Sequence, residues 1–389
     1  MDLVLTPEEQ GYYARQIAIP QFGMAGQLAL KSASVLVVGA GGLGCPILLY
    51  LAAAGVGRIG IADYDRVSLS NLHRQIIYGI GDCGQSKVAT AAAALRLRNP
   101  LVEVIEHDAA VNSEEVTQLV STYDVVVDAT DNFSTKFLLN DACWFAGKPM
   151  VYGSIHRFEG QLAVFNLKSV HGDGCSPNYR DLYPAPPPAA LAPDCSTAGV
   201  LGVLPGLVGC LQANEVIKIV TGVGEVLAGR LLIVDALSGS TRLMRLRHQP
   251  GNPLSGVNRQ IHQVKSITEE VSLDGPVRSI SANELIEWQA QSRSMVLVDV
   301  RNADERAVFS LGGVHWPLSA TDSELPDIGD AELIVTYCQS GIRSRHAAAK
   351  LIRKGYAVER VLSLDGGVSS FLGAGYRKEM LPDPTGGTK

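Results

Sequence analysis

The chain has 389 residues, of which 46% are hydrophobic and 19% are charged, and its 33 basic and 39 acidic side chains give a formal net charge of −6. This apolar content excludes a disordered chain, because enough surface can be buried to offset the entropy cost of folding. At roughly 100 to 200 residues per domain, the length predicts two or three domains. The acidic balance, without any long run of Lys or Arg, argues against a nucleic-acid-binding protein.

The seven cysteines are odd in number, are spread over the whole chain and contain no Cys-x-x-Cys pair. This usage is unlike a secreted disulfide framework or a zinc ribbon. The first residues, MDLVLTPEEQ, lack the basic and then apolar segments of a signal peptide. We therefore expect a cytoplasmic protein. The cysteines are Cys45, Cys83, Cys143, Cys175, Cys195, Cys210 and Cys338.

The uncharged stretch from Ser32 to Gly57 is long enough to span a bilayer. Its internal order predicts something else, because SVLVVGAGGLG is a β-branched run that stops at a glycine cluster and CPILLYLAAAGV has helical spacing. We expect a strand, a tight turn and a helix here, and no membrane partner.

From Val35 onward, strand-like runs alternate with helical stretches as far as PMVYGSI. This alternation predicts parallel βαβ units in a doubly wound α/β sheet, with the ligand at the carboxyl ends of the strands. A Pro-rich crossing loop, HGDGCSPNYRDLYPAPPPAALAPDCST, interrupts the pattern before the helical GLVGCLQANEVIKIVTG and the hairpin-like GRLLIVDALSGSTRLMRL.

A second alternation of strands and helices begins near residue 277, after a polar stretch that predicts a linker. SISANELIEWQ predicts a capped amphipathic helix, MVLVDVR, LIVTYC and RVLSLDG predict strands, and SRHAAAKLIRKGY predicts a helix. We therefore expect a first domain over 1–250, a linker over 251–276 and a small α/β domain over 277–389.

Gly39, Gly41 and Gly44 form the motif G-x-G-x-x-G, with Gly42 inside it, directly after a predicted strand and at the start of a helix. These glycines let backbone N–H groups and the helix dipole approach a phosphate. Asp63 ends the next predicted strand, about 20 residues later, where a carboxylate can hold ribose hydroxyls. This pattern alone fits an NAD-dependent dehydrogenase, an ATP site or a glycine turn without a ligand.

The residues that follow favour chemistry at the phosphates of ATP. Hydride transfer has no use for two cations and a spare carboxylate at the phosphate end. Attack on the α-phosphate does, because Arg and Lys stabilise the developing charge and Asp can hold Mg²⁺. The residues are Asp65, Asn71, Arg74 and Gln75 after the strand, Lys87 at the start of the next helix, and Asp131 and Asn132 after VVVDAT.

Five ordered motifs, GAGGLG, D-x-D, N-L-x-R-Q, G-Q-S-K and D-A-T-D-N, resemble the MoeB/ThiF family of ubiquitin-activating-type adenylyltransferases. The match runs from Y-x-R-Q-I at Tyr13 to about Met244. The resemblance implies a Rossmann-like domain that uses ATP and Mg²⁺ to adenylate the C-terminal glycine of a small ubiquitin-fold sulfur carrier ending in Gly-Gly.

The same resemblance implies roles for individual residues. Asp63 would hold the ribose, Asn71, Arg74 and Lys87 the triphosphate, and Asp131 the Mg²⁺ ion. Arg15 would reach the ATP of the other subunit, which implies a homodimer.

Two features of the crossing loop bear on this resemblance. Cys195 stands where some family members carry an acceptor cysteine, although it can equally be a loop residue without a role. Most relatives have one C-x-x-C before the loop and another after the last strand, which together bind zinc. Here the first pair is Asn178 and Asp181, the segment GNPLSG has no cysteine, and Cys175 lacks partners, so we expect no structural zinc.

In the C-terminal part, LVDVR, YCQSGIRS and LDGG resemble a single-domain rhodanese. Cys338 ends a predicted strand, and its loop leads into a helix, so successive N–H groups can surround the sulfur and stabilise a persulfide. The alternative is a buried structural cysteine. The segment VFSLGGVHWPL is shorter than its counterpart in that family. The loop is Cys338, Gln339, Ser340, Gly341, Ile342 and Arg343.

Together, the two domains predict adenylation of the carrier followed by sulfur transfer from Cys338, which gives a thiocarboxylate as in molybdopterin-type biosynthesis. We expect Cys195 to resolve an acyl disulfide if it takes part, and a cysteine desulfurase or thiosulfate to supply the sulfur. Two alternatives remain open: the same chemistry for a carrier in thiolated secondary-metabolite, thiamine or cysteine biosynthesis, and an ATP-binding scaffold without transfer. A dehydrogenase ranks third.

Overall fold

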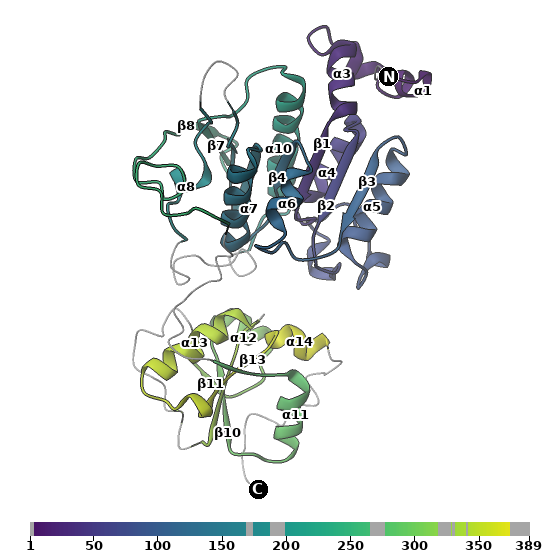
Figure 1. The fold of residues 1–389 in the computed structure, drawn as a ribbon. Coiled ribbons are helices and arrows are strands. Elements are labelled where there is room, and N and C mark those ends of the chain that lie inside the picture. The colour runs from purple at the N-terminus through teal and green to yellow at the C-terminus, as the bar shows by residue number, and fades with distance from the viewer. Residues whose placement is uncertain are drawn as a thin grey trace. The chain divides into compact units, whose positions relative to one another are not determined.

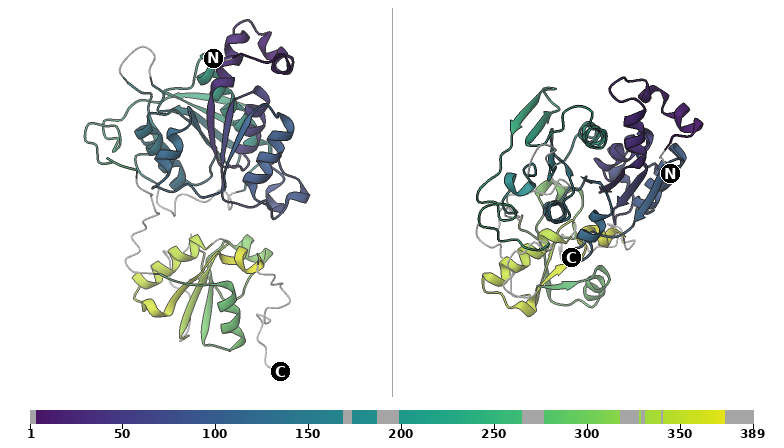
Figure 2. Two further views of the ribbon diagram at one scale, coloured as in Figure 1. Left: turned by 45° about the vertical axis from the view of Figure 1, so that its right-hand side comes forward. Right: turned by 45° about the horizontal axis from the view of Figure 1, so that its top comes forward.

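The computed structural model describes residues 4–168, 174–186, 199–264, 277–317, 328, 331–339 and 341–373. The chain divides into two compact units, Met1–Thr268 and Glu269–Lys389 (Figures 1 and 2). Each unit has its own sheet and its own core, as expected for two α/β domains.

The first unit is built on an eight-stranded sheet in the order β3-β2-β1-β4-β5-β6-β7-β8. The first five strands in this order run parallel, and the last three are joined antiparallel. The parallel part confirms the predicted doubly wound sheet, and β7 and β8 form the predicted hairpin. The strands are β1 Ser34–Val38, β2 Arg58–Ala62, β3 Glu103–His107, β4 Val125–Asp128, β5 Met150–His156, β6 Glu159–Phe165, β7 Arg230–Asp235 and β8 Thr241–Arg245.

Helices cover both faces of this sheet (Figure 1). Side chains alternate along a strand, so Val35 and Val37 of β1 pack under α4, α5 and α10, while Leu36 and Val38 pack under α6 and α7. The helices are α1 Pro7–Tyr12, α2 Ala14–Ile17, α3 Gly23–Ser32, α4 Gly44–Ala54, α5 Lys87–Arg98, α6 Val116–Ser121, α7 Phe133–Ala146, α8 Tyr179–Leu182 and α10 Val203–Thr221, with 3-10 turns η1 Leu69–Asn71 and η2 Ile80–Asp82.

The segment 32–57 forms β1, a tight turn and α4, as predicted from its sequence. Within the described residues, one helix, α10, is long and apolar enough to cross a membrane by length and composition. Leu204, Val208 and Val216 of α10 are fully buried in the core of the first unit. A core helix of this kind passes the same test, so α10 is no sign of a membrane span.

The first unit continues past the predicted boundary at residue 250. Asn252 is fully buried and Leu254 is 1% exposed. The polar composition of this stretch suggested a linker from residue 251, but its polar side chains are hydrogen-bonded inside the unit. The first unit therefore includes at least the start of the predicted linker.

The second unit is a five-stranded parallel sheet in the order β11-β10-β12-β13-β9. Its two faces again bury alternate residues, with Leu297 and Val335 on one side and Val298 and Ile334 on the other. The strands are β9 Arg278–Ile280, β10 Met295–Asp299, β11 Val314–His315, β12 Leu333–Tyr337 and β13 Val361–Leu364; the helices are α11 Ala282–Ala290, α12 Ala303–Val308, α13 Ile342–Arg353 and α14 Gly367–Gly373, with the 3-10 turn η4 Val358–Arg360.

Helix α11 starts with the predicted cap. Ser281 Oγ accepts a hydrogen bond from Glu284 N at 3.3 Å, and Ser281 N donates to Glu284 Oε2 at 3.0 Å, which completes a capping box. We predict that Ser281→Ala destabilises α11 by about 1 kcal/mol, because the N–H group of Glu284 loses its acceptor and the capping box is broken. Amide hydrogen exchange in peptides from 282–290 should become roughly fivefold faster. Ser281→Thr keeps the hydroxyl and should exchange like the wild type; equal rates in all three proteins would contradict the prediction.

Candidate active site

The carboxyl ends of β1, β2 and β4 bring together three of the predicted site segments. These strands are neighbours in the sheet order β2-β1-β4 and run parallel, so their ends meet at one edge. Gly39 follows β1, Asp63 follows β2, and Ala129 follows β4. This edge is where an open α/β sheet binds its ligand.

The turn after β1 requires glycine at two positions. Gly39 has φ +98°, and a Cβ atom there would lie 2.6 Å from the carbonyl oxygen of Ala129. A Cβ atom on Gly44 would overlap the carbonyl group of Gly39. The turn therefore packs directly on the segment that follows β4, and α4 starts immediately behind it.

Asp63 ties this turn to the loop that follows β2. Its Oδ2 accepts a hydrogen bond from Ala40 N at 2.7 Å, and its Oδ1 accepts one from Asp65 N at 2.8 Å. Asp65 Oδ2 in turn forms an ion pair with Lys87 Nζ at 2.7 Å. Lys87 is 4% exposed, so its ammonium group is held inside the protein at the start of α5.

Tyr78 links the glycine turn to the first turn of α5. Its hydroxyl donates to the carbonyl oxygens of Ala40 at 2.8 Å and of Lys87 at 3.2 Å. Burial raises the pKa of Tyr78, so the phenol stays neutral and remains a donor. The glycine turn and the first turn of α5 are thereby fixed to each other.

Asn71, Arg74 and Gln75 form a compact group beside Gly41 and Gly42 of the glycine turn. Asn71 Oδ1 accepts hydrogen bonds from Arg74 Nη2 at 2.9 Å and from Gln75 Nε2 at 3.1 Å. A Cβ atom on Gly42 would lie 3.4 Å from Arg74 Cγ, and one on Gly41 would lie 3.6 Å from Gln75 Nε2. Gln75 is 3% exposed, and its Oε1 has no hydrogen-bond partner within the described residues.

The loop after β4 carries Asp131 and Asn132, both of which are exposed. Asn132 caps α7 by accepting a hydrogen bond from Thr135 N at 2.9 Å. This loop leaves Asp131 at the carboxyl edge of β4, next to the glycine turn, which packs on Ala129.

A buried ion pair holds this loop from below, and sequence reasoning missed it. Asp128 is fully buried; its Oδ2 pairs with Lys136 Nζ at 2.9 Å, and its Oδ1 accepts hydrogen bonds from Thr130 N at 3.0 Å and Thr130 Oγ1 at 2.6 Å. Lys136 Nζ also donates to the carbonyl oxygen of Gly153 at 2.8 Å. The available signal was a lysine within the apolar helix pattern KFLLNDACWFAG that follows a strand ending in aspartate.

The donor set fits Mg²⁺ that shares a nucleotide's phosphates. No group of three or more His, Cys, Asp or Glu residues able to hold a metal occurs among the described residues. A phosphate-bound Mg²⁺ needs only one or two carboxylates from the protein, and Asp131 can supply one.

Arg15 does not join these residues within one chain. It is exposed on α2, and its neighbour Gln16 donates to the carbonyl oxygen of Ala54 at 3.1 Å, at the last residue of α4. The glycine turn lies at the other end of α4, which at 1.5 Å per residue is about 16 Å away. Cys195 lies outside the described residues.

In the second unit, Cys338 follows β12 directly and its loop leads into α13, as predicted. Cys338 is buried, and its Sγ accepts a hydrogen bond from Gly341 N at 3.1 Å. Gly341 has φ +90°, which turns this N–H group back toward the sulfur. Ser340 and the side chain of Ile342 are not among the parts of the chain that the structure describes.

Arg343, the last residue of the predicted loop, is held by Glu305 of α12. Its Nη1 and Nη2 atoms donate to the two carboxylate oxygens at 2.8 and 2.6 Å. Burial alone would raise the pKa of Glu305, but the hydrogen bonds from Arg343 and Asn302 hold that pKa below its usual value. Gln339 Nε2 donates to Ser369 Oγ at 3.1 Å, so α14 also contacts this loop.

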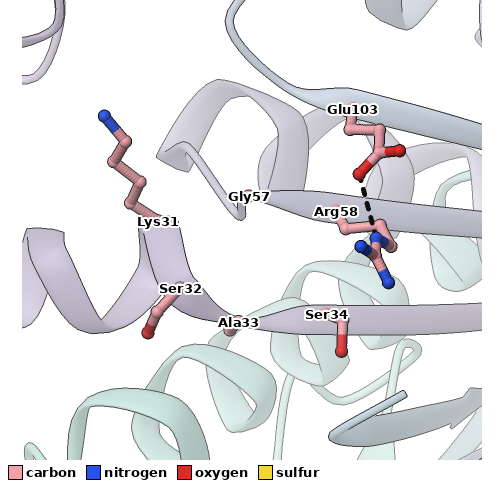
Figure 3. Close-up of a pocket in the computed structure, with 7 residues that line it drawn as sticks. All are labelled: Lys31, Ser32, Ala33, Ser34, Gly57, Arg58 and Glu103. Carbon is pink, nitrogen blue, oxygen red and sulfur yellow. Dashed lines mark hydrogen bonds and ion pairs between the residues drawn. The ribbon is translucent and has the colours of Figure 1, made fainter. Parts of the chain in front are cut away.

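A pocket elsewhere on the first unit is not part of this site (Figure 3). It lies at the starting ends of β1, β2 and β3, at the sheet edge opposite the glycine turn. The Arg58–Glu103 ion pair beside it, at 2.9 Å, has both side chains about half exposed, which is typical of a surface pair. The lining residues are Lys31, Ser32, Ala33, Ser34, Gly57, Arg58 and Glu103.

We predict that Gly39→Ala destabilises the first unit by about 2 kcal/mol, because the turn requires a positive φ that a residue with a Cβ atom disfavours and because the new Cβ atom would displace Ala129. Gly41→Ala is the matched control, since the Cβ atom there makes only an ordinary contact with Gln75. Hydrogen exchange in peptides from β1 and β4 measures the difference, which should be roughly thirtyfold in rate. Equal exchange in the two variants would show that the turn does not depend on Gly39.

Each unit matches a known protein family. Residues 13–254 match the ThiF family, and residues 281–374 match the rhodanese-like domain. The probable adenylyltransferase/sulfurtransferase MoeZ of Mycobacterium tuberculosis is 41% identical over 383 residues, covering 97% of this chain and 95% of that protein. The sulfur carrier protein adenylyltransferase of Thermus thermophilus is 49% identical over 251 residues, covering 64% of this chain and 92% of its own.

Solved structures give the same fold for the first unit. E. coli MccB in complex with AMPCPP and MccA has a TM-score of 0.55 at 20% identity, covering 64% of this chain and 74% of that one. PaaA has a TM-score of 0.51 at 22% identity, covering 64% and 77%. With the ThiF match over more than half of its length and a relative aligned along almost all of it, the chain belongs to the ThiF family and carries a rhodanese domain at its C-terminal end.

Proposed function

We propose that the chain converts the C-terminal glycine carboxylate of a small ubiquitin-fold sulfur carrier, ending in Gly-Gly, first to an acyl-adenylate and then to a thiocarboxylate. The observation that carries the proposal is the meeting of a glycine turn, two cations and a carboxylate at one sheet edge, on a chain whose second unit presents a cysteine to a backbone N–H group. The names of the relatives, adenylyltransferase/sulfurtransferase and sulfur carrier protein adenylyltransferase, support it.

In this proposal, ATP binds across the glycine turn. Backbone N–H groups from Gly41 to Gly44, at the start of α4, face its phosphates. Asp63 holds the ribose, and Asp131, with Asn132 beside it, holds Mg²⁺, which supplies neutralisation of the triphosphate charge. The ion pairs and hydrogen bonds described above already position the cations: Lys87 through Asp65, and Arg74 with Gln75 through Asn71.

Adenylation follows from these positions. A carboxylate oxygen of the carrier's last glycine attacks the α-phosphorus atom, the bond to the β-phosphate oxygen breaks, and pyrophosphate leaves. Arg74 and Lys87 stabilise the negative charge that develops on the phosphate oxygens. The product is a mixed anhydride whose leaving group is AMP.

Sulfur transfer uses the second unit. The terminal sulfur of a Cys338 persulfide attacks the acyl carbon and expels AMP, which leaves an acyl disulfide. The Gly341 N–H group donates to Cys338 Sγ and so stabilises the thiolate that takes up the sulfane sulfur. A thiol, Cys195 or an external reductant, then exchanges with the disulfide and releases the thiocarboxylate. A second external thiol reduces the disulfide left on Cys338, and the freed thiolate takes a sulfane sulfur from a cysteine desulfurase persulfide or from thiosulfate, which leaves as sulfite.

The assembly in this proposal is a homodimer in the cytoplasm, with a carrier of the molybdopterin type. Its support is the placement of Arg15 at the end of α4 away from the glycine turn, from which it can serve a second subunit and not its own. Neither nucleic acid nor a membrane takes part.

The first test concerns Asp131. Asp131→Ala removes the carboxylate that holds Mg²⁺, and we predict a loss on the order of a thousandfold in carrier-dependent pyrophosphate–ATP exchange. Glu114→Ala, an exposed carboxylate on the same unit, is the matched control and should retain full exchange. Unchanged exchange in Asp131→Ala would remove this residue from the site.

The second test separates the two chemistries. Cys338→Ala should abolish thiocarboxylate formation and leave pyrophosphate exchange within about twofold, since independent sites do not couple. Cys195→Ala should spare exchange and slow turnover only if the loop cysteine resolves the acyl disulfide. Mass spectrometry of the carrier detects the sulfur-for-oxygen mass gain. Full yield from Cys338→Ala with thiosulfate or a desulfurase would make the second unit a docking module.

A further inference from the structure

The start of the crossing loop is fastened by polar residues in two pairs with the same spacing. Asn178 caps the one-turn helix α8 and Asp181 lies within it, and Asn252 and Ser255 follow the last strand of the first unit. Asn178 and Asn252 are fully buried, and Asp181 is 8% exposed. These four residues occupy the positions at which the family resemblance implies two C-x-x-C pairs that bind zinc.

The two pairs contact each other directly. Asn178 Nδ2 donates to Ser255 Oγ at 2.8 Å, and Asn252 Nδ2 donates to Asn178 Oδ1 at 3.1 Å. Asp181 Oδ2 accepts from Asn178 N at 2.8 Å, and its Oδ1 accepts from Gln249 N at 2.8 Å. These hydrogen bonds join two segments that are about seventy residues apart in the sequence. Each side chain is bonded either to a residue of the other pair or to a neighbouring backbone group.

The oxygen atoms of this group are engaged with N–H donors. Asn252 Oδ1 accepts from Leu254 N at 2.8 Å and from Ser255 N at 3.1 Å, and Asn178 Oδ1 also accepts from Arg180 N at 2.9 Å. None of the four side chains is among the buried polar groups that lack a partner in the described part of the chain. Each would have to break these bonds to turn toward a cation.

The donor chemistry does not fit zinc. Structural zinc takes four ligands drawn from thiolate, imidazole and carboxylate, whereas this group offers two amides, one hydroxyl and one carboxylate. The nearby His248 gives its Nε2 to the carbonyl oxygen of Cys175 at 2.9 Å, and its Nδ1 lies 3.5 Å from Asp181 Oδ2. Cys175 thus contacts His248 through its backbone carbonyl group.

A buried ion pair also holds α8 in place. Arg180 forms two bonds with Asp141 of α7, from Nε to Oδ1 at 2.8 Å and from Nη2 to Oδ2 at 2.7 Å, and its guanidinium lies 4.8 Å from the ring centroid of Phe137. Both ions are buried. A helix of four residues has no stability of its own, so these contacts and the hydrogen-bonded pairs must hold it in place.

We infer that Asn178, Asp181, Asn252 and Ser255 form a metal-free hydrogen-bonded clasp, which joins the base of the crossing loop to the end of the first unit in place of a structural zinc. The inference rests on the contacts of these four residues and is independent of the proposed reaction.

The first experiment measures metal content and melting temperature of the full chain, purified without chelators. We expect far less than one equivalent of zinc and no change in melting temperature on adding the zinc chelator TPEN with Mg²⁺ present. One equivalent of zinc, together with a lower melting temperature after chelation, would overturn the clasp.

The second experiment uses the geometry of the clasp. The combined variant Asn178→Cys, Asp181→Cys, Asn252→Cys and Ser255→Cys should bind one Co²⁺ or Zn²⁺ per chain, with the absorption bands of tetrahedral cobalt thiolate, because the four positions converge. The matched control replaces Ser255→Cys by Ser240→Cys, in the exposed turn of the β7–β8 hairpin. A folded four-cysteine variant without tight binding, or equal binding by the control, would show that the positions do not converge.

An alanine cycle tests the clasp without new cysteines. Asn178→Ala and Asn252→Ala should each lower the melting temperature by about 5 °C, because each leaves buried polar groups unpaired. The double variant should lose clearly less than the sum of the two, since the residues share one hydrogen bond. Additive losses, or no loss in either single variant, would contradict the inference.

Discussion

The buried pair of Asp128 and Lys136 is the interaction on which the candidate adenylation site depends. It places one charge of each sign beneath the sheet edge, where breaking the pair would leave an uncompensated ion and cost about 3 to 5 kcal/mol. Asp128 also holds Thr130, so the loop that ends in Asp131 has a fixed course. The glycine turn packs on Ala129 in that same loop, and Asp63 bonds to the turn through Ala40. The positions of the glycine turn, Asp63 and Asp131 are therefore fixed from one buried ion pair.

The two proposed reactions require different kinds of charge stabilisation, and each unit has its own arrangement of polar groups. Adenylation requires cationic side chains that can bind phosphate oxygens but do not form permanent ion pairs within the protein. Lys87 and Arg74 accordingly rest on Asp65 and Asn71, an exposed carboxylate and a neutral amide that phosphate oxygens can replace. Sulfur transfer requires an anion to be stabilised without a bound metal, and Gly341 offers a backbone N–H group to Cys338 for that purpose. In the proposed reaction sequence, having both units on one chain raises the concentration of the persulfide near the activated carrier.

Sequence reasoning succeeded where the pattern that predicts a structural feature lies in neighbouring residues. The glycine turn, the start of α5 at Lys87 and the strand–loop–helix at Cys338 are local patterns, and the structure has each of them. It failed where a contact joins separate elements. For Lys136 and Asp128, the sequence offered only a lysine in an apolar helix pattern after a strand that ends in aspartate. The polar residues after Gln249 have the composition of a linker, although Asn252 is hydrogen-bonded to Asn178. The roles of Arg15 and Cys195 stay predictions, because they depend on a second subunit and on residues beyond the description.

The measurement that tests the central claim most directly follows oxygen atoms through the reaction. The carrier is prepared with ¹⁸O in both oxygens of its C-terminal carboxylate and converted by the full chain with ATP, Mg²⁺ and a sulfur donor. Activation as an acyl-adenylate predicts that each thiocarboxylate formed is matched by one AMP carrying a single ¹⁸O, because the carboxylate oxygen that attacked the α-phosphorus leaves with AMP. Thiocarboxylate formed with unlabelled AMP, or with the label in inorganic phosphate, would contradict the account.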